Sequence, residues 1–466
     1  MVASNARTDR ERVVVTGTGW VTPLGCDVDS VWTKLLAGAS GIAPVRRFDA
    51  GTWSTSFAAQ VPHREGAASG DGFELFDFMD EAATAHARAG LSTRFALAAA
   101  AQAWVQAGLG EKTGRRTAEL DPDRLGVYLG AGEGSLDYPN YIAANLAAWF
   151  GGDGTTADAA SFARTGLERL TAAREVEQEP HLTVSHLAEA FDARGPSLNC
   201  MTACAASTQA VGEATEIIRR GDADVMLAGG AHSMIHILGM TGFSRLTAMS
   251  TRRDDPATAS RPFDKTRDGF VMGEGAGVVV LESLESARRR GATVLAEIVG
   301  FGSSADAYRI TDIDPEGFGA VKAMRQALEQ AGIDPTKNGP DGRPSVHYVS
   351  AHGTGTQEND GLETKAVRQV FGELAPSVPF ASLKSMTGHL IQAAGAVELI
   401  ACIQSIRTGF IPPTVNLNTP DPECDLDHVP NAARDRRDDG GVEVCLSNSF
   451  GFGGQNDTVC VRRYEG

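Results

Sequence analysis

A strand, a turn and a helix occur in the same order at two places in this chain, and that internal repeat constrains the fold more than any other feature. Leu198–Cys204 leads into a helix that ends at Gly221, and Phe380–Met386 leads into a helix that ends at Gly409. Strands that alternate with helices are typical of α/β folds. The repeat therefore predicts two similar halves that meet near residues 285–295.

Short apolar runs bounded by glycine predict the buried strands of both halves. They are Val13–Gly17, Leu125–Leu129, Val225–Gly230, Val278–Leu281, Val346–Ala351 and Val442–Leu446. The second and fifth runs correspond to each other in the repeat, because a glycine-rich turn follows each. Gly17 is expected to open a turn after the first strand. The alanine-rich segment Leu91–Leu109 predicts a helix.

Composition limits the kinds of partner. The formal net charge is −17, and no basic stripe is present to neutralise phosphates, so nucleic acid is not expected as the main partner. No apolar run is long enough to span a bilayer, so no membrane association is expected. Seven cysteines without framework spacing indicate a reduced, cytoplasmic compartment. The polar residues 1–12 are expected to be disordered.

Cys204 falls at the first turn of a predicted helix, within the run Thr202–Ser207. Backbone N–H groups and the helix dipole at that place favour a thiolate. The small neighbouring residues leave space for a group on the sulfur. Taken alone, this motif fits a nucleophile and a small buried side chain equally well.

Two histidines follow strands at comparable turns of the repeat, His352 in the run His352–Thr356 and His389 after Lys384. Three chemistries use one cysteine and two histidines. A zinc site would use these ligands, but no close Cys-x-x-Cys or His-x-x-x-His spacing supports it. A cysteine hydrolase leaves the second histidine without a role. A thioester-forming condensing enzyme uses all three, because two neutral histidines suit the stabilisation of an enolate.

Phe450 and Phe452 lie in the glycine-rich run Asn448–Gly454 near the C-terminus. Two aromatic residues in such a loop fit a mobile lid over an acyl pocket. They also fit a tight hairpin whose phenylalanines fill the core. The sequence leaves both interpretations open.

Together, these motifs resemble the β-ketoacyl synthases, in particular the elongating type that acts with a separate acyl carrier protein. The resemblance runs from about Val13 to the C-terminal strand. The residues that carry it are Thr202–Ser207, Arg261–Asp264, Asp268–Gly277, His352–Thr356, Lys384 with Gly388-His389, and Asn448–Gly454. It implies a thiolase-like fold in which two βαβαβαβ-derived halves, residues 13–288 and 289–466, form a layered α-β-α-β-α structure.

The resemblance also implies a two-stage reaction. Cys204 takes an acyl group from a carrier thioester, and a malonyl thioester then loses CO2 and attacks the acyl-cysteine through its carbanion. The implied roles are an enolate-stabilising pair, His352 and His389; a structural and electrostatic pair beside them, Lys384 and Glu363; an oxyanion hole from the backbone N–H groups of Cys204 and Phe450; an acyl gate, Phe450 with Phe452; and pantetheine-binding hydroxyls, Thr354 and Thr356.

By the same resemblance, the partners are an acyl carrier protein and a second subunit, either an identical one or a related one. No metal or other cofactor is implied. Two alternatives remain. A thiolase would need a second catalytic cysteine in a late Cys-x-Gly loop, where this chain has Asn448–Gly451, and Cys445 and Cys460 lie in predicted strands. A non-catalytic partner that sets chain length usually lacks the nucleophile.

Three departures from the family pattern stand out. Residues 134–186 form a longer connection than usual, in a region that helps to shape the dimer contact and the pocket. Glu133 places an acid where an apolar residue usually lines the pocket. Met79–Ala83 is acidic and small where related enzymes often have a basic docking segment. The alternative candidates for carrier docking are Arg88, Arg94, Arg252 and Arg253.

Glu133 generates a test of the acyl chain. An unpaired carboxylate against an alkyl chain is costly, so a Glu133 that faces the pocket indicates a chain other than a plain saturated one. On this hypothesis Glu133→Ala loses selectivity for that chain when a panel of acyl-carrier thioesters is offered. Unchanged selectivity would contradict the hypothesis.

Overall fold

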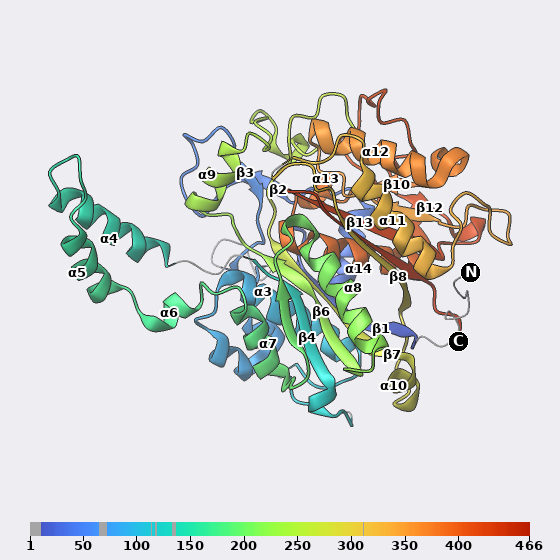
Figure 1. Ribbon diagram of the computed structural model, residues 1–466, viewed down its shortest axis with the longest axis horizontal. Helices are drawn as coiled ribbons and strands as arrows, with labels where there is room; N and C mark the ends of the chain where they lie inside the picture. Colours follow the sequence, from blue (N-terminus) through green and yellow to red (C-terminus); the bar gives the residue numbers. More distant parts are fainter. Residues whose placement is uncertain (1–10, 65–71, 113, 117–118, 133–136, 311) are drawn as a thin grey trace.

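One ten-stranded mixed sheet runs through the protein (Figure 1). The computed structural model describes residues 11–64, 72–112, 114–116, 119–132, 137–310 and 312–466. The first half of the sheet contains β1 (Val13–Val21), β4 (Leu125–Gly130), β5 (Ser197–Cys200), β6 (Val225–His232) and β7 (Gly275–Ser283). The second half contains β8 (Ala296–Ala305), β9 (Tyr348–Ser350), β10 (Phe380–Ala381), β13 (Val444–Gly451) and β14 (Gln455–Arg462).

The two halves have the same topology. The strand order is β10-β9-β13-β14-β8-β1-β7-β6-β4-β5. Read outward from the centre, β8-β14-β13-β9-β10 in one half corresponds to β1-β7-β6-β4-β5 in the other. In each half the first strand pairs antiparallel with the last, and the second, third and fourth strands are parallel. The halves join where β1 pairs antiparallel with β8. The internal repeat is therefore confirmed, with β4 equivalent to β9 and β5 equivalent to β10.

Helices complete the predicted α-β-α-β-α layers. The central layer consists of α8 (Ala206–Arg219) and α14 (Ala394–Thr408), which contact each other and strands of both halves. The outer layers are α3 (Leu91–Gln106) with α7 (Leu182–Phe191) on one side and α11 (Phe318–Ala331) with α12 (Gln357–Phe371) on the other. The smaller elements include α1 (Val28–Leu36), α2 (Phe76–Met79), α9 (Ile237–Arg245), α10 (Leu284–Arg289), α13 (Lys384–Thr387), β2 (Ile42–Pro44), β3 (Phe57–Ala59), β11 (Phe410–Ile411) and β12 (Arg434–Asp435).

The first strand corrects one prediction. Gly17 does not open a turn, because β1 continues through it to Val21. A Cβ at Gly17 would lie 2.0 Å from the carbonyl oxygen of Ala103, so the glycine serves the close approach of α3. The second half repeats this device, since a Cβ at Gly302 in β8 would lie 2.0 Å from the Ala323 oxygen in α11.

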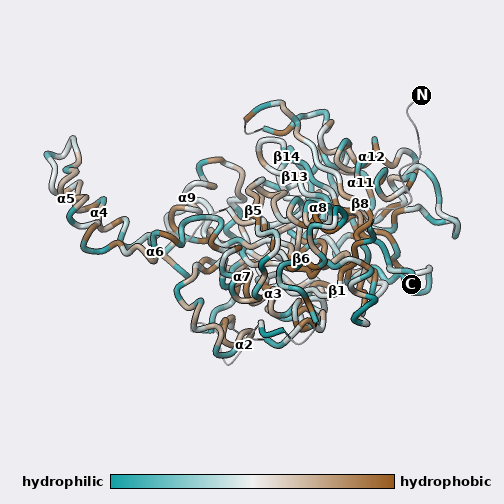
Figure 2. The backbone as a smooth tube through the Cα atoms, turned by 60° about the horizontal axis from the view of Figure 1, so that its bottom comes forward, coloured by the Kyte–Doolittle hydropathy of each residue, from teal (hydrophilic) through white to brown (hydrophobic). Residues whose placement is uncertain are grey.

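The apolar core lies in the strands and in the central helices. In Figure 2 hydrophobic stretches follow β1, β6 and β8 through the interior. Every residue of α14 from Ala394 to Ile406 is buried. A helix that is apolar on all faces is expected to be enclosed by other elements. The sheet halves on either side of α14 provide that enclosure.

Residues 138–176 form an arm that projects from the body (Figure 1). It contains α4 (Tyr138–Gly151), α5 (Ala159–Arg169) and α6 (Ala172–Val176), and α4 packs against α5. No charged residue occurs in α4, and several large apolar side chains of the arm face outward. They are Tyr141, Leu146, Trp149, Phe150, Leu167 and Val176. The long connection that the sequence singled out is thus largely an independent helical hairpin.

Three further observations concern the sequence predictions on compartment and termini. All seven cysteines are free thiols. No helix in the described parts of the chain has the length and apolar character needed to cross a membrane. Residues 1–10 of the predicted disordered segment lie outside the described residues, and Arg12 is bound to Glu297 through two hydrogen bonds of 2.8 and 2.9 Å.

The glycines of the sheet generate a stability test. Gly302→Ala should lower the free energy of unfolding by about 2 kcal/mol or more, because the new methyl group overlaps the backbone of α11. Chemical denaturation measures this change. The matched control is Gly242→Ala in α9, where a Cβ meets no atom within 4 Å, so stability should rise slightly. Equal effects of the two substitutions would contradict the packing argument.

Candidate active site

Cys204 lies in a strained turn at the start of α8. The 3-10 turn Ala203–Ala205 precedes the helix, and Ala203 has φ 49°, in the left-handed region. A residue with a side chain is rarely found there, and such strain is held by its surroundings. The equivalent turn of the second half contains Ile391 at φ 44° and precedes α14. Both halves therefore build the same turn, and the first presents the cysteine.

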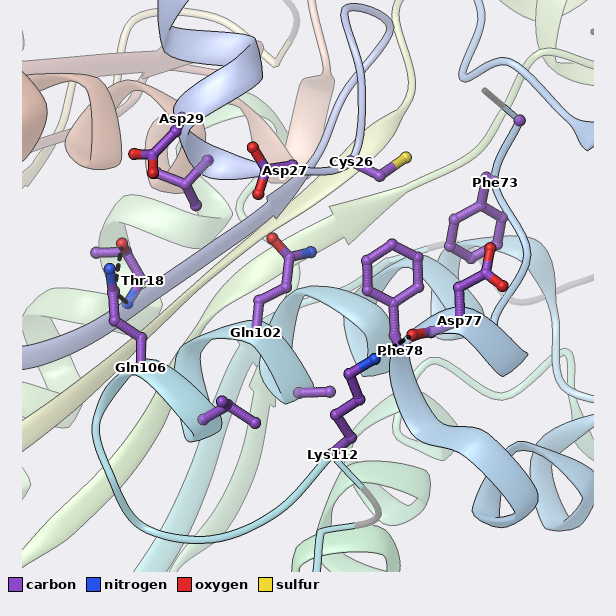
Figure 3. Close-up of a pocket in the computed structure, with 14 residues that line it drawn as sticks. Thr18, Cys26, Asp27, Asp29, Phe73, Asp77, Phe78, Gln102, Gln106 and Lys112 are labelled. Carbon is purple, nitrogen blue, oxygen red and sulfur yellow. Dashed lines mark hydrogen bonds between the residues drawn. The ribbon is translucent and has the colours of Figure 1, made fainter. Parts of the chain in front are cut away.

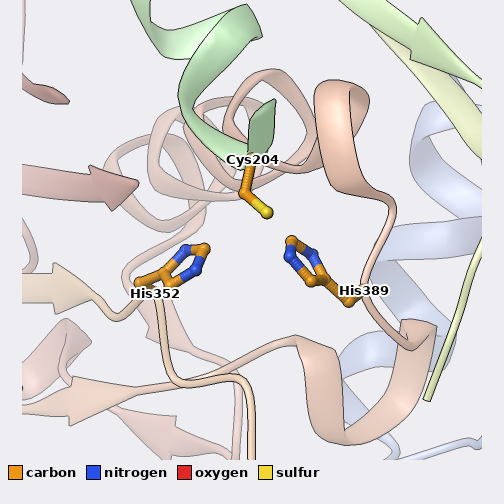
Figure 4. Close-up of side chains that lie close together, drawn as sticks. All are labelled: Cys204, His352 and His389. Carbon is orange, nitrogen blue, oxygen red and sulfur yellow. The ribbon is translucent and has the colours of Figure 1, made fainter. Parts of the chain in front are cut away.

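Cys204, His352 and His389 converge, as their sequence positions predicted. In Figure 4 the Cys204 sulfur lies between the two imidazole rings. One Sγ or ring nitrogen from each residue lies within 4.8 Å of the other two. The two rings are nearly perpendicular, with centroids 5.3 Å apart. All three side chains are almost completely buried. The arrangement places two potential hydrogen-bond donors beside one nucleophile.

The segment Val271–Gly273 fixes the backbone of His389. The His389 N–H donates to the Val271 carbonyl at 2.7 Å, and the Gly273 N–H donates to the His389 carbonyl at 2.8 Å. Phe270 makes an edge contact with the imidazole at 5.5 Å between centroids. This explains why the run Asp268–Gly277 accompanies the site in the sequence, although none of its side chains carries an obvious catalytic group.

Glu363 holds the turn that carries His352. Its carboxylate accepts the backbone N–H groups of His352 and Gly353, both at 2.8 Å, and the Asn448 amide at 3.2 Å. Burial raises the pKa of Glu363 to about 7, and these donors oppose the shift. Glu363 therefore positions the backbone of the turn that carries His352. The role of Asn448 was missed in the sequence, although its motif was recognised.

Lys384 pairs with Glu398 and not with Glu363, which corrects the predicted pairing. The Lys384 Nζ and a Glu398 carboxylate oxygen form a short, fully buried ion pair. Burial raises the pKa of Glu398 above its ordinary value, against the pull of the lysine. A buried charge without a partner is very costly. The sequence signal for Glu398 was a lone acid in the apolar helix α14.

The surroundings keep both histidines neutral. Burial lowers the pKa of His352 well below its ordinary value, and the charge of Lys384 and the neighbouring His389 lower it further. Burial and Lys384 lower the pKa of His389 in the same way, with a smaller contribution from His232. Neutral imidazoles can donate one hydrogen bond each without carrying a charge. This matches the requirement stated from the sequence.

Cys204, His352 and His389, called the trio below, line a cavity of about 690 Å³ that opens to the surface. Thr354 and Thr356 line it, with their hydroxyl oxygens 3.1 Å apart. Phe450 and Phe452 also line it. Phe450 is buried against His352, at 5.9 Å between ring centroids, whereas Phe452 is 40% exposed. The loop is a tight β13–β14 hairpin, and its first phenylalanine both fills the core and faces the cavity. Glu133 lies outside the described residues.

A second cavity, of about 550 Å³, lies beside α3 (Figure 3). It contains a cysteine, Cys26, with Asp27, Asp29 and Lys112 among the polar residues. None of its lining residues is a histidine. Burial raises the pKa of the Cys26 thiol to about 12, so this thiol is a poor nucleophile. The first cavity is therefore the candidate active site.

Comparison with known proteins agrees with this choice. Residues 10–287 match the N-terminal domain of β-ketoacyl synthases, and residues 295–418 match their C-terminal domain. Two curated relatives are named 3-oxoacyl-[acyl-carrier-protein] synthase 2, and both are 38% identical to this chain. The protein from Coxiella burnetii aligns over 98% of this chain and 99% of its own length, and that from Synechocystis sp. over 99% and 100%.

Solved structures show the same likeness. A β-ketoacyl synthase from Burkholderia phymatum has a TM-score of 0.81 and 32% identity, over 98% of this chain and all of that one. A structure described as a type II polyketide synthase acyl-carrier protein in complex with its ketosynthase bound to the hexaketide gives a TM-score of 0.80 and 31% identity, over 98% of this chain and 100% of that one.

The fold and the buried cysteine with two histidines define a thiolase-like condensing enzyme. Within that class, the chain belongs to the β-ketoacyl synthase family and is an acyltransferase. The resemblance stated from the sequence is confirmed. The thiolase alternative finds no support, because Cys445 and Cys460 lie fully buried in β13 and β14.

The neutrality of the two histidines can be tested directly. Between pH 6 and 8 the imidazole ¹⁵N signals of His352 and His389 should not titrate, since both pKa values lie well below 6.5. NMR of histidine-labelled protein measures this, with His352→Gln and His389→Gln used to assign the signals. A titration midpoint within this range for either residue would contradict the prediction.

Proposed function

We propose that this enzyme elongates acyl chains by decarboxylative condensation, with the growing chain held on Cys204. The observation that carries the proposal is the convergence of a buried cysteine with two neutral histidines in the wall of a cavity of about 690 Å³. In the first stage, the Cys204 sulfur attacks the carbonyl carbon of a carrier-bound acyl thioester. The new C–S bond forms as the carrier C–S bond breaks, and the carrier thiol leaves with the proton.

In the second stage a malonyl thioester enters the cavity and loses CO2. The electron pair of the broken C–C bond becomes an enolate, and hydrogen bonds from His352 and His389 to its oxygen stabilise it. The enolate carbon then attacks the acyl carbonyl on Cys204, and the thiolate leaves. The backbone N–H groups of Cys204 and Phe450 stabilise the oxyanion of that step. No metal or redox cofactor takes part in this scheme.

The proposed partner is an acyl carrier protein, which the names of the curated relatives and one solved neighbour also mention. The hydroxyls of Thr354 and Thr356 suit the amide-rich pantetheine arm. Lys365 and Arg309 line the cavity and are candidates to bind its phosphate, although Arg309 also pairs with Asp312 at 3.0 Å. The four arginines suggested from the sequence do not line the cavity, and burial lowers the pKa of one of them, Arg94.

Acyl loading tests the central assignment. After incubation with a panel of acyl-carrier thioesters, intact-mass spectrometry should show one acyl group per chain, and Cys204→Ala should abolish loading. The matched control is Cys26→Ala, which removes a thiol from the cavity without histidines and should load normally. If loading persists in Cys204→Ala, the assignment of the nucleophile is wrong.

We further infer that the enzyme is a homodimer, joined at the β5 edge of the sheet. The opposite edge, β10, is covered, because the Phe380 N–H donates to the Asp427 carbonyl at 2.7 Å. In the described part of the chain β5 pairs only with β4; Leu198 in β5 and Met201 just after it are 44% and 59% exposed. Open strand edges favour pairing with another strand, and an isologous pair of identical strands is the simplest such arrangement.

The exposed apolar face of the arm supports the same inference. The arm lies between β4 and β5 in the sequence, and β5 is the strand at the proposed dimer edge. The double substitution Trp149→Glu and Phe150→Glu should reduce the mass in solution from twice 48.9 kDa toward 48.9 kDa, measured by light scattering after size exclusion. Val105→Glu, at an exposed apolar residue of α3, is the control and should leave the mass unchanged. A dimer that resists the arm substitutions would remove the arm from the interface.

A further inference from the structure

The catalytic trio is also a set of metal ligands. One ligand atom each from Cys204, His352 and His389 lies within 4.8 Å of the other two, and all three side chains are buried. The Nδ1 atom of His352 and both ring nitrogens of His389 are buried without a hydrogen-bond partner. A buried polar atom without a partner carries a free-energy cost. These nitrogens are therefore available to a ligand that enters the cavity.

The residue types and their number fit zinc. Zn²⁺ binds cysteine sulfur at about 2.3 Å and histidine nitrogen at about 2.0–2.1 Å in a tetrahedron, so the ligand atoms of a filled site lie roughly 3.3–3.6 Å apart. If the side chains rotate so that their ligand atoms move by roughly an ångström, the three atoms reach that spacing. Three protein ligands leave the fourth position open. All three residues line the cavity, which gives an ion its way in.

We propose that Cys204, His352 and His389 bind a zinc-class divalent cation, and that the bound ion excludes acyl loading. On binding, the Cys204 thiol loses its proton to solvent and its sulfur electron pair bonds to the ion. The same electron pair would otherwise attack the acyl thioester. The inhibitory consequence rests on the proposed function, whereas the binding itself does not. Ligand spacing in the sequence did not support zinc, because the three ligands are far apart along the chain.

A second candidate cluster, Asp341, His347 and Glu443, provides the matched control. The His347 Nδ1 atom accepts the Val444 N–H at 3.3 Å, which leaves the proton of the neutral ring on the nitrogen that faces the acids. The Arg343 side chain lies among these acids, with its Nε 2.5 Å from Asp341. A guanidinium thus already occupies the place of a cation. Zinc is expected to prefer the trio.

The binding test uses the full chain, freed of metals with a chelator. Zn²⁺ titrated against a chromophoric chelator should bind at one ion per chain. Loss of a direct ligand in Cys204→Ala should weaken the affinity on the order of 100-fold or more, since even outer-shell changes cost about 10–100-fold. His347→Ala should have no effect. Co²⁺ should give a thiolate-to-metal absorption band that Cys204→Ala lacks. Equal affinity in Cys204→Ala, or loss of affinity in His347→Ala, would overturn the proposal.

Two further measurements separate this proposal from the proposed function. Alkylation of Cys204 in the wild-type protein should abolish Zn²⁺ binding, which tests the ligand without a mutant. Zn²⁺ should block acyl loading, and a chelator should restore it. If the chelated enzyme loads acyl groups but binds no zinc at the trio, the metal proposal fails and the function stands. If the chelated enzyme fails to load, the proposed function is wrong whatever the zinc result.

Discussion

The close packing of α8 against α14 links the two halves of the protein at their centre. A Cβ at Gly395 would lie 1.9 Å from the Thr208 hydroxyl oxygen, so only glycine allows this approach. The Ala396 N–H donates to Ser207 at 3.0 Å, and Thr208 bonds to Ser449 on β13 at 2.7 Å. Because the helices meet at their starts, the turns before them meet as well. Cys204 of one half is thereby brought to His352 and His389 of the other.

The two halves of the repeat carry different residues at equivalent positions. The strained turn before α8 presents Cys204, whereas its counterpart before α14 contains Ile391 and is preceded by His389. The sheet edges also differ: among the described residues, the chain itself covers β10 and leaves β5 uncovered. The first half thus carries the proposed nucleophile, and the second half carries the two histidines proposed to stabilise the enolate.

The charged side chains near the trio are each balanced by a partner. These side chains are Lys384 and Glu363. Lys384 lowers the pKa values of both histidines, while Glu398 balances its charge inside the protein. The Glu363 carboxylate accepts the backbone N–H groups of the turn that carries His352, and the Asn448 amide. The histidines therefore remain neutral with unpartnered nitrogens. That condition suits an enolate, and it also leaves the trio open to a soft metal ion.

The amino-acid sequence alone was enough to predict the fold class, the repeat, six of the strands and the grouping of Cys204, His352 and His389. These follow from apolar periodicity and from motifs that are local in the chain, where a few neighbouring residues decide the outcome. Sequence reasoning failed where contacts between distant segments determine the structure. Gly17 was expected to open a turn because the approach of α3 is not visible in one segment, and Lys384 was paired with Glu363 because its true partner lies on α14.

The folded molecule was needed to show which groups share the cavity, which charges are compensated and how Asn448 supports Glu363. It also showed that the residues of the long connection form a projecting hairpin with an apolar face. The physical reason is the same in each case. Burial, charge balance and ligand geometry are properties of atoms that are close in space, and the chain order fixes them only after the two halves have packed together.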